Sequence, residues 1–392
     1  MKSKITKIIF LISAPFNQRD YQRFGFEILI RDGFEVCIWD FTPLLYPKTF
    51  MKVQPPDPIN YHNMVSFRSK KDAIEVIKKE DKNVFLISLI PYNHLTICIL
   101  RTISKFNIPY CVCTPNATLG TPKDMGNKLI KKIRSITITK LLDYYLLKIS
   151  PKYINIKPAV LCLLGGKKSF GKRQEVNDMT RLLWIHTLDY DVYLENNKKS
   201  ISTNTAVFID NYLPFHPDYL YSGRKHMNPD DYYPFLNRFF KYFEDKTGLE
   251  VIIAAHPRSL YGKSTDYFNG RKVIRGATAE LIRDAKCVIL HTSTAINYCV
   301  LFKKPMMFIT TDELKKHLLG RRTEVTAPYF GKVPINISGT FNVDLKKEFF
   351  VDDTIYSKYK HDYIKIDGTR ELQFWQVVSN EIKSLNVSVS LL

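Results

Sequence analysis

A His-Pro pair and a Ser-Thr pair in the second half of the chain combine side chains that bind phosphate. His256 ends one apolar, strand-like run, and Ser293 and Thr294 follow another run, one strand-and-helix crossover later. The helix expected at 294–302 would offer free backbone N–H groups and a partial positive charge at its N-terminus. His256 can donate a hydrogen bond from its imidazole or carry a positive charge. These residues predict a phosphate-binding site without a glycine-rich loop.

Further polar residues follow the same kind of run. Pro257 and Arg258 continue the His-Pro turn, and Arg258 and His216 would add positive charge near a phosphate. Thr311 and Glu313 follow the apolar run at 305–310, where contacts to a ribose or a base are expected. Because ligands of open parallel sheets bind beyond the carboxyl ends of the strands, these residues are predicted to line one binding site. The alternative is that each is an ordinary turn or capping residue.

Strand-like and helix-like segments alternate through the chain, which indicates parallel sheets joined by helical crossovers. The apolar run at 7–13 is typical of a strand buried on both faces. Further strands are expected at 34–41, 83–90, 109–114, 159–164, 181–188, 206–210, 250–255, 272–276, 287–292 and 305–310. Helices are expected near 94–106, 230–248, 278–285, 294–302 and 371–385.

The predicted fold class is therefore α/β, with two Rossmann-like parallel-sheet domains that face a cleft. The polar stretch near 190–204 is rich in Asn, Ser and Lys and suits a junction between them. The expected N-terminal domain is 1–200. The expected C-terminal domain is 201–392 and includes the helix at 371–385.

Composition limits the class of partner. The chain has 58 Lys and Arg against 38 Asp and Glu, a formal net charge of +20. This excess suggests nucleic acid, an acidic membrane surface or a phosphorylated small molecule, although Lys-rich solvated surfaces are the plain alternative. No aromatic-basic motif or recognition helix is present, so nucleic acid is not expected. The seven cysteines lack zinc-ligand spacing and lie mostly in apolar runs, which favours a reducing compartment without disulfides.

The segment 123–152 mixes Lys and Arg with Leu, Ile and Tyr and holds few acidic residues. This pattern suits a basic amphipathic helix on an anionic membrane, and equally an ordinary surface helix with lysines on its solvated face. No apolar run reaches about 18 residues, so no transmembrane helix is expected. The start of the chain fits a core strand better than a signal peptide. A cytoplasmic protein is the expectation, and the first interpretation of 123–152 would place it at the inner face of the cytoplasmic membrane.

The His-Pro and Ser-Thr pairs of this sequence resemble motifs of known protein families. His-Pro in "EVIIAAHPRS", followed one crossover later by Ser-Thr in "HTST", is similar to the HP and S/T motifs of bacterial sialyltransferases, polysialyltransferases and capsule Kdo transferases. A looser resemblance extends to glycerophosphotransferases of wall teichoic acid synthesis. The resemblance covers mainly 203–315, and the first half of the chain matches only in architecture. It implies the GT-B fold, a CMP-sugar donor and no metal.

At the position of the catalytic base, this sequence departs from the pattern of these families. The families it resembles use a carboxylate in an acidic-acidic-Gly motif, and this chain has no such tripeptide. Asp210, at the end of the run 206–210, is the nearest analogue and could accept the proton of an acceptor hydroxyl. Alternatively, Asp210 caps the following turn. Asp189, Asp191 and Asp20 are rival candidates.

The resemblance thus predicts a metal-independent glycosyltransferase of bacterial surface polysaccharide or lipopolysaccharide synthesis, without a cofactor. The donor, favoured as a CMP-linked acid sugar such as sialic acid or Kdo, would bind the second domain. A glycan or lipid-linked glycan acceptor would bind the first domain near Asn17, Arg19 and Asp20, which follow the first strand. The alternatives are a polyol-phosphate transferase, a nucleotide-sugar epimerase of the same two-domain shape, and a non-catalytic membrane-docking relative.

Overall fold

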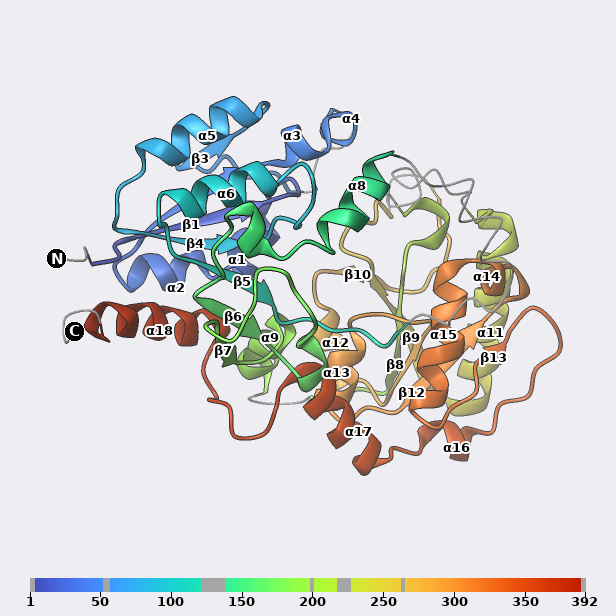
Figure 1. Ribbon diagram of the computed structural model, residues 1–392. Helices are drawn as coiled ribbons and strands as arrows, with labels where there is room; N and C mark the ends of the chain where they lie inside the picture. Colours follow the sequence, from blue (N-terminus) through green and yellow to red (C-terminus); the bar gives the residue numbers. More distant parts are fainter. Residues whose placement is uncertain are drawn as a thin grey trace. The chain divides into compact units, whose positions relative to one another are not determined.

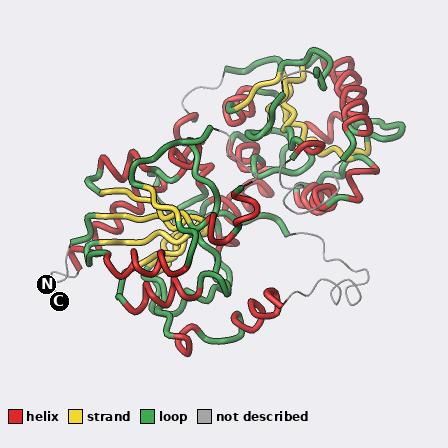
Figure 2. Tube along the Cα trace, turned by 90° about the horizontal axis from the view of Figure 1, so that it is seen from above, coloured by secondary structure: helices red, strands yellow, loops and turns green. Residues whose placement is uncertain are grey.

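The computed structural model describes residues 4–51, 57–120, 138–197, 201–216, 227–261 and 265–388. The chain divides into two compact units. Unit 1 comprises Met1–Asn116, Asp124–Leu188 and Lys365–Leu392, and unit 2 comprises Ala117–Lys123 and Asp189–Ile364. Figure 2 shows that the strands of each unit form a layer with helices around it.

Unit 1 is built on a seven-stranded sheet with the order β3-β2-β1-β4-β5-β6-β7, in which all pairings are parallel. The strands are β1 (Lys7–Ile12), β2 (Glu35–Asp40), β3 (Met64–Ser66), β4 (Val84–Ser88), β5 (Tyr110–Thr114), β6 (Leu161–Leu164) and β7 (Arg181–Trp184). The helices are α1 (Gln18–Arg23), α2 (Phe26–Arg31), α3 (Thr42–Leu45), α4 (Pro47–Phe50), α5 (Lys70–Lys79), α6 (Ile97–Lys105), α8 (Ile138–Leu146) and α18 (Phe374–Ser388), with the short 3-10 helices η1 (Pro151–Ile154) and η2 (Lys167–Ser169) (Figure 1).

The central strands of this sheet are apolar on both faces because helices cover both. Alternate residues of β1, such as Ile8 and Ile9, enter different hydrophobic clusters. Phe85 and Leu86 of β4 divide in the same way. A continuous apolar run is the expected sequence of such a strand, since successive side chains point to opposite faces.

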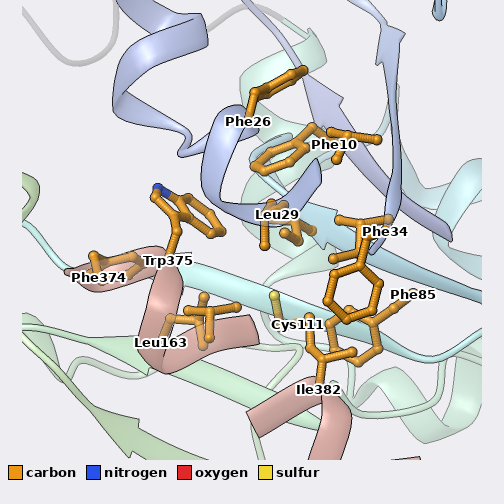
Figure 3. Packing of buried hydrophobic residues seen from close by; sticks show 14 of the residues in the cluster. Phe10, Phe26, Leu29, Phe34, Phe85, Cys111, Leu163, Phe374, Trp375 and Ile382 are labelled. Carbon is orange, nitrogen blue, oxygen red and sulfur yellow. The ribbon is translucent and has the colours of Figure 1, made fainter. Parts of the chain in front are cut away.

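The C-terminal helix α18 belongs to unit 1, not to the second domain in which the sequence placed it. Trp375 packs edge-on against Phe10 of β1, and its indole N–H donates to the carbonyl of Arg23 at 2.7 Å. Figure 3 shows Trp375 and Ile382 within the apolar cluster on this face of the sheet. Sequence spacing predicted the helix but could not predict its partner, because the helix returns to a sheet more than 300 residues earlier in the chain.

Unit 2 is built on a six-stranded parallel sheet with the order β10-β9-β8-β11-β12-β13. The strands are β8 (Thr205–Ile209), β9 (Glu250–Ala255), β10 (Val273–Arg275), β11 (Cys287–Leu290), β12 (Met306–Thr310) and β13 (Ile335–Asn336). The helices are α9 (Leu188–Asn196, entered from unit 1), α11 (Tyr233–Thr247), α12 (Thr278–Asp284), α13 (Ile296–Leu301), α14 (Asp312–Lys316), α15 (Leu318–Tyr329), α16 (Leu345–Phe349) and α17 (Asp353–Tyr359), with 3-10 helices η3 (Leu213–Phe215) and η4 (Pro229–Asp231) and the π-helix η5 (Lys360–Ile364).

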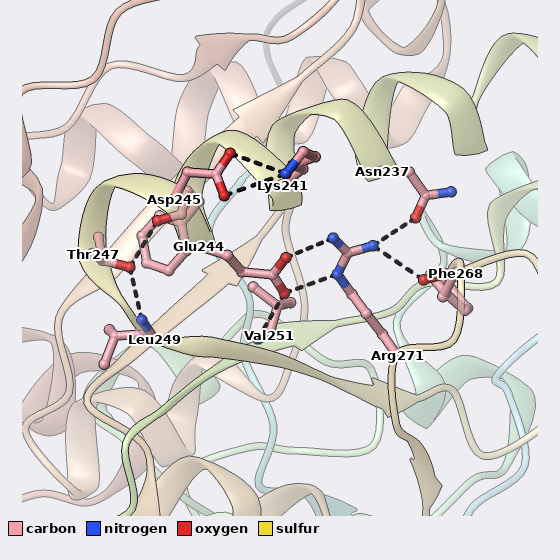
Figure 4. A network of polar contacts seen from close by, with 10 residues as sticks. Asn237, Lys241, Glu244, Asp245, Thr247, Leu249, Val251, Phe268 and Arg271 are labelled. Atoms are coloured by element: carbon pink, nitrogen blue, oxygen red, sulfur yellow. Dashed lines mark hydrogen bonds and ion pairs between the residues drawn. The ribbon is translucent and has the colours of Figure 1, made fainter.

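An arginine ties helix α11 to the segment that precedes β10 (Figure 4). Nε and Nη2 of Arg271 donate to the two carboxylate oxygens of Glu244 at 2.9 and 2.6 Å, and Nη1 donates to Asn237 and to the carbonyl of Phe268. Oε1 of Glu244 also accepts from the N–H of Val251 at the start of β9. This two-pronged ion pair fixes α11 against the sheet that carries the candidate site.

The expected fold class, two parallel-sheet α/β domains, is confirmed by these two sheets. The short strands β3 and β13 and the helices α14 to α17 escaped prediction, because two or three residues show no clear alternation and the region after 310 lacks the strand-helix rhythm. Of the basic segment 123–152, the part before 138 lies outside the described residues. The rest forms α8 and η1.

Candidate functional site

The loops after β8, β9 and β11 lie together at the carboxyl ends of the parallel strands of unit 2. Ile209 of β8 pairs with Ala254 of β9 on one side and with Leu290 of β11 on the other. The segments that begin at His256 and His291 therefore flank the end of β8. Two strand spacings, about 10 Å, separate β9 from β11, so only side chains that converge over the end of β8 can contact one phosphate group.

The backbone around His256 fixes the orientation of its ring. Its N–H donates to Oδ2 of Asp210 at 3.4 Å, and its Nδ1 accepts from the N–H of Arg258 at 3.2 Å. Pro257 and the exposed Arg258 lie in a turn closed by the N–H of Ser259, 2.8 Å from the His256 carbonyl. Because Nδ1 accepts a hydrogen bond, the proton of the neutral ring resides on Nε2. Nε2 is therefore a hydrogen-bond donor, as a phosphate oxygen requires.

A second imidazole lies against His256. His216 directly follows η3, and its ring centroid is 4.7 Å from that of His256, with the ring planes at 65°. The sequence suggests positive charge from His216 near a phosphate, and the contact with His256 places this residue beside the His-Pro turn. The second ring packs against His256 and further restricts its orientation.

Asp210 is a buried carboxylate, with 2% of its surface exposed. Oδ1 accepts from the N–H of Tyr212 at 2.9 Å, and the Tyr261 hydroxyl also donates to the carboxylate. Burial raises the pKa of Asp210 to about 6, although these bonds and the one from His256 favour the charged form. The bond from Tyr212 closes the turn after β8, as expected if Asp210 caps this turn. In this geometry Asp210 positions the His256 loop.

Asn211 joins the end of β8 to the segment after β11. Its Nδ2 donates to the carbonyl of Thr292 at 3.0 Å. Its Oδ1 is buried and has no hydrogen-bond partner among the described atoms. Sequence reasoning missed Asn211. The one sequence signal for Asn211 was that it directly follows Asp210, the candidate residue at the end of a predicted strand.

The Ser-Thr segment forms a turn before a helix that is shorter than expected. Oγ of Ser293 accepts from the N–H of Ala295 at 3.1 Å, and Thr294 is exposed. The helix α13 begins at Ile296 and has six residues, so few peptide dipoles are aligned toward this turn. The local donors of a phosphate site here are thus the hydroxyls of Ser293 and Thr294 more than a helix dipole.

His291, two residues before Ser293, supports the strand end. It is fully buried. Nδ1–H donates to the carbonyl of Ile309 at 2.7 Å, and the hydroxyl of Tyr232 donates to Nε2 at 2.8 Å. Burial lowers the pKa of His291 to about 4, so the ring is neutral at physiological pH.

Thr311 and Glu313 both take part in the first turn of α14. Thr311 is buried, and its hydroxyl oxygen accepts from the N–H of Leu314 at 3.0 Å as the helix cap. Glu313 forms ion pairs with Lys316 at 2.7 Å and with His317 at 3.5 Å. These contacts give both residues a structural role, and their contact with a ribose or base stays a prediction.

The acceptor-side residues follow β1 in unit 1. Oδ1 of Asn17 accepts from the N–H of Asp20 at 3.0 Å and caps α1, while Arg19 is exposed. The rival base Asp189 accepts from Nδ2 of Asn297 at 2.9 Å. Within the described residues, no group of three His, Cys, Asp or Glu side chains could hold a metal ion. No helix in the described part of the chain is long and apolar enough to cross a membrane.

No protein-family model and no curated protein sequence matches the chain. Solved structures do resemble it. The wall teichoic acid polymerase TagF aligns with a TM-score of 0.49 and 14% identity over 98% of this chain and 91% of that one. The UDP-GlcNAc 2-epimerase from Methanocaldococcus jannaschii aligns with 0.44 and 9% over 97% and 99%, and Acinetobacter baumannii MurG with 0.40 and 10% over 98% and 100%. Likenesses this weak do not assign an activity.

Proposed function

We propose that this chain is a nucleotide-sugar-dependent glycosyltransferase of the GT-B type, with the donor bound to unit 2. The observation that carries the proposal is the fixed geometry of His256, whose Nε2 is a donor at the carboxyl edge of the sheet. Its ring is held by the N–H of Arg258, and its backbone is held by Asp210. Ser293 and Thr294 lie at the same edge, on the other side of β8.

The chemistry assigned to these residues is stabilisation of the leaving group. In the transfer, an acceptor hydroxyl oxygen attacks the anomeric carbon, and the bond from that carbon to the donor phosphate oxygen breaks. The phosphate keeps the electron pair, and a base takes the hydroxyl proton. Hydrogen bonds from His256 and from Ser293 or Thr294 strengthen as negative charge develops on the phosphate, which lowers the barrier. A metal ion is not required in this scheme.

The donor is proposed to be a CMP-linked acid sugar, on the resemblance of the His-Pro and Ser-Thr motifs. The base is open between Asp210 and its rivals, because the burial of Asp210 favours a positioning role. The acceptor is proposed to be a bacterial surface glycan that contacts unit 1 near Asn17, Arg19 and Asp20.

A membrane surface is proposed as a further partner through α8. Every described side chain of this helix is at least partly exposed, including Leu141, Leu142, Tyr144 and Tyr145. Asp143 anchors the helix, since it accepts from the N–H of His94 at 2.8 Å and contacts the ring of that histidine. Aromatic and aliphatic side chains next to lysines suit the interface of an anionic bilayer.

A thermal-shift screen against CMP, CDP, UDP, GDP and dTDP tests the donor assignment, followed by transfer assays with the corresponding sugars. Stabilisation by CMP and transfer from a CMP-sugar to a glycan are expected. Protein that binds no nucleotide and transfers from no CMP-, UDP-, GDP- or dTDP-sugar would refute the proposal. Conversion of a free nucleotide sugar without an acceptor would instead indicate an epimerase, and transfer from CDP-glycerol a polyol-phosphate transferase.

A further inference from the structure

A wide groove of about 1810 Å³ lies on unit 1. It lies at the amino ends of strands in this unit, whereas the candidate residues described above follow the carboxyl ends of strands. Its lining includes Asn107, Pro158 and Thr180, which precede β5, β6 and β7. Most of the rest comes from α6, from the segment 147–157 that follows α8, and from 170–179, with Ile74 of α5 and Leu182 of β7. The groove therefore opens at the amino ends of these strands, whereas Asn17, Arg19 and Asp20 follow the carboxyl end of β1.

The groove is strongly basic. Seven cationic side chains line it and one acidic side chain, Asp178, does so, whereas the whole chain has 58 cations to 38 acids. The cations are Arg101, Lys105, Lys148, Lys152, Lys157, Lys172 and Arg173. Lysines spread evenly over the surface would not give this ratio. The positive excess of the protein is thus partly concentrated at one place.

Among the described residues, no carboxylate pairs with these cations at close range. All seven are exposed, and none has a carboxylate within 4.0 Å in the described part of the chain. Weaker contacts are present: Glu175 attracts Arg173, Nζ of Lys148 lies 5.2 Å from the centre of the Tyr144 ring, and Nζ of Lys157 donates to the side chain of Asn107. Elsewhere, cations such as Arg271 and Lys303 are paired with acids. Clustered like charges repel one another, and a bound anion relieves that repulsion.

The walls of the groove are held in place. The N–H of Lys157 donates to Oγ of Ser104 on α6 at 2.9 Å, and the Tyr110 hydroxyl donates to the Lys157 carbonyl at 2.8 Å. Nε2 of Gln174 donates to the carbonyl of Leu147 at 2.8 Å, which joins the two long segments. A groove with fixed walls loses little conformational entropy when a ligand binds.

We propose that this groove binds an anionic polysaccharide, one that carries a carboxylate or phosphate group at regular intervals along the chain. Its volume exceeds the roughly 300–1,000 Å³ of small-molecule pockets, so it suits several units of an extended ligand. Its cations line a concave surface, which a flat bilayer meets less well than a narrow chain. The exposed Phe170 offers an apolar face for a sugar ring.

The proposal deepens the proposed function, since a transferase of acid sugars makes an anionic product, and it rests on that function for the identity of the ligand. A groove on the proposed acceptor unit that holds the chain would raise the local concentration of its growing end. Binding itself requires no catalysis, and this separates the test of the groove from the test of transfer.

The test is fluorescence anisotropy of the full chain with labelled oligosialic acid, with dextran of matched length as the neutral probe and no nucleotide present. The oligosialic acid is expected to bind and the dextran not. The groove variant combines Lys105→Glu, Lys152→Glu and Arg173→Glu. The control variant combines Lys246→Glu, Lys346→Glu and Lys358→Glu, which are exposed on unit 2 and carry the same change of charge.

The groove variant is expected to bind about tenfold more weakly or worse at about 0.1 M salt, and the control variant to bind like the wild type. Equal losses in both variants would overturn the proposal, since net charge alone would explain them. Binding only to phosphatidylglycerol vesicles, or tighter binding to single-stranded DNA than to the glycan, would also overturn it. Circular dichroism melts of both variants confirm folding, so a loss of binding is assigned to the groove.

Discussion

The carboxylate of Asp210 accepts a hydrogen bond from the backbone N–H of His256, at 3.4 Å. The buried end of β8 therefore holds the loop after β9, and with it the ring that Arg258 orients through Nδ1. A substitution of either residue should therefore alter the position of the other. The effect on KM compared with the effect on kcat distinguishes a positioning residue from a catalytic base.

Asp210→Asn is expected to raise the KM for the donor with little effect on kcat. The amide nitrogen would face the N–H of His256 or Tyr212, so one hydrogen bond to the loop is lost. Steady-state kinetics over pH 5–9 measure this. A fall in kcat of about 10²–10⁴-fold, with loss of the acidic limb of the pH profile, would instead make Asp210 the base. Asp189→Asn is the matched test of the rival.

His256→Ala is expected to weaken nucleotide binding about ten- to hundredfold, the effect of losing one hydrogen bond to a charged group worth about 1.5–3 kcal/mol. His256→Gln should restore part of the affinity, because its amide can donate. Calorimetry with the nucleotide found by thermal shift measures both. His62→Ala, an exposed histidine of unit 1, is the control. Unchanged affinity in His256→Ala would remove the proposed phosphate contact.

His291 and Asp210 should give unit 2 opposite pH dependences. The pKa of His291 is lowered to about 4, so the unfolded state binds more protons and stability rises as pH rises from about 4 to about 6.5. The pKa of Asp210 is raised to about 6, so stability falls as pH rises from about 4 to about 6, by about 3 kcal/mol. The two effects largely cancel in the wild type.

Each variant should expose the other effect. The stability of His291→Gln is expected to fall as pH rises from 4 to 6, and the stability of Asp210→Asn is expected to rise over the same range. Urea unfolding of unit 2 at several pH values, followed by a probe in that unit, measures the trend. Parallel pH profiles for the two variants would contradict the assigned pKa directions.

Trp375→Ala should destabilise unit 1 by about 3–5 kcal/mol, because it leaves a cavity between α18 and β1. Gly25→Ala should act on the same contact, since Gly25 has a φ of +58° and an added Cβ would lie 2.4 Å from Trp375. Chemical unfolding measures both. Leu372→Ala, at an exposed side chain nearby, is the control with little expected effect. Loss of unit 2 stability alone would contradict the placement of α18.

Leu142→Ser with Tyr145→Ser should reduce co-sedimentation with vesicles that contain phosphatidylglycerol, since both side chains are exposed on α8. Part of the wild-type binding should persist at high salt, because apolar insertion is not screened. The control is Val333→Ser with Phe350→Ser, exposed apolar residues of unit 2. Equal binding of the α8 variant and wild type would refute a membrane role for this helix.

The sequence by itself determined the fold class. Strands buried on both faces need uninterrupted apolar runs. The runs that form β1, β4 and β12 can be recognised in the sequence without any tertiary information. The same rule predicted that His256, Ser293 and Thr294 follow strand ends, because position after a strand is a local property of the chain.

Tertiary structure alone decided which residues meet. The pairing of His216 with His256, the burial of Asp210 and the return of α18 to unit 1 depend on contacts between segments far apart in sequence. The seven cations of the basic groove are likewise spread over three segments: α6, 147–157 and 170–179. Sequence periodicity reports which face of an element is buried, but not which other element covers it, because that choice depends on the packing of the whole unit.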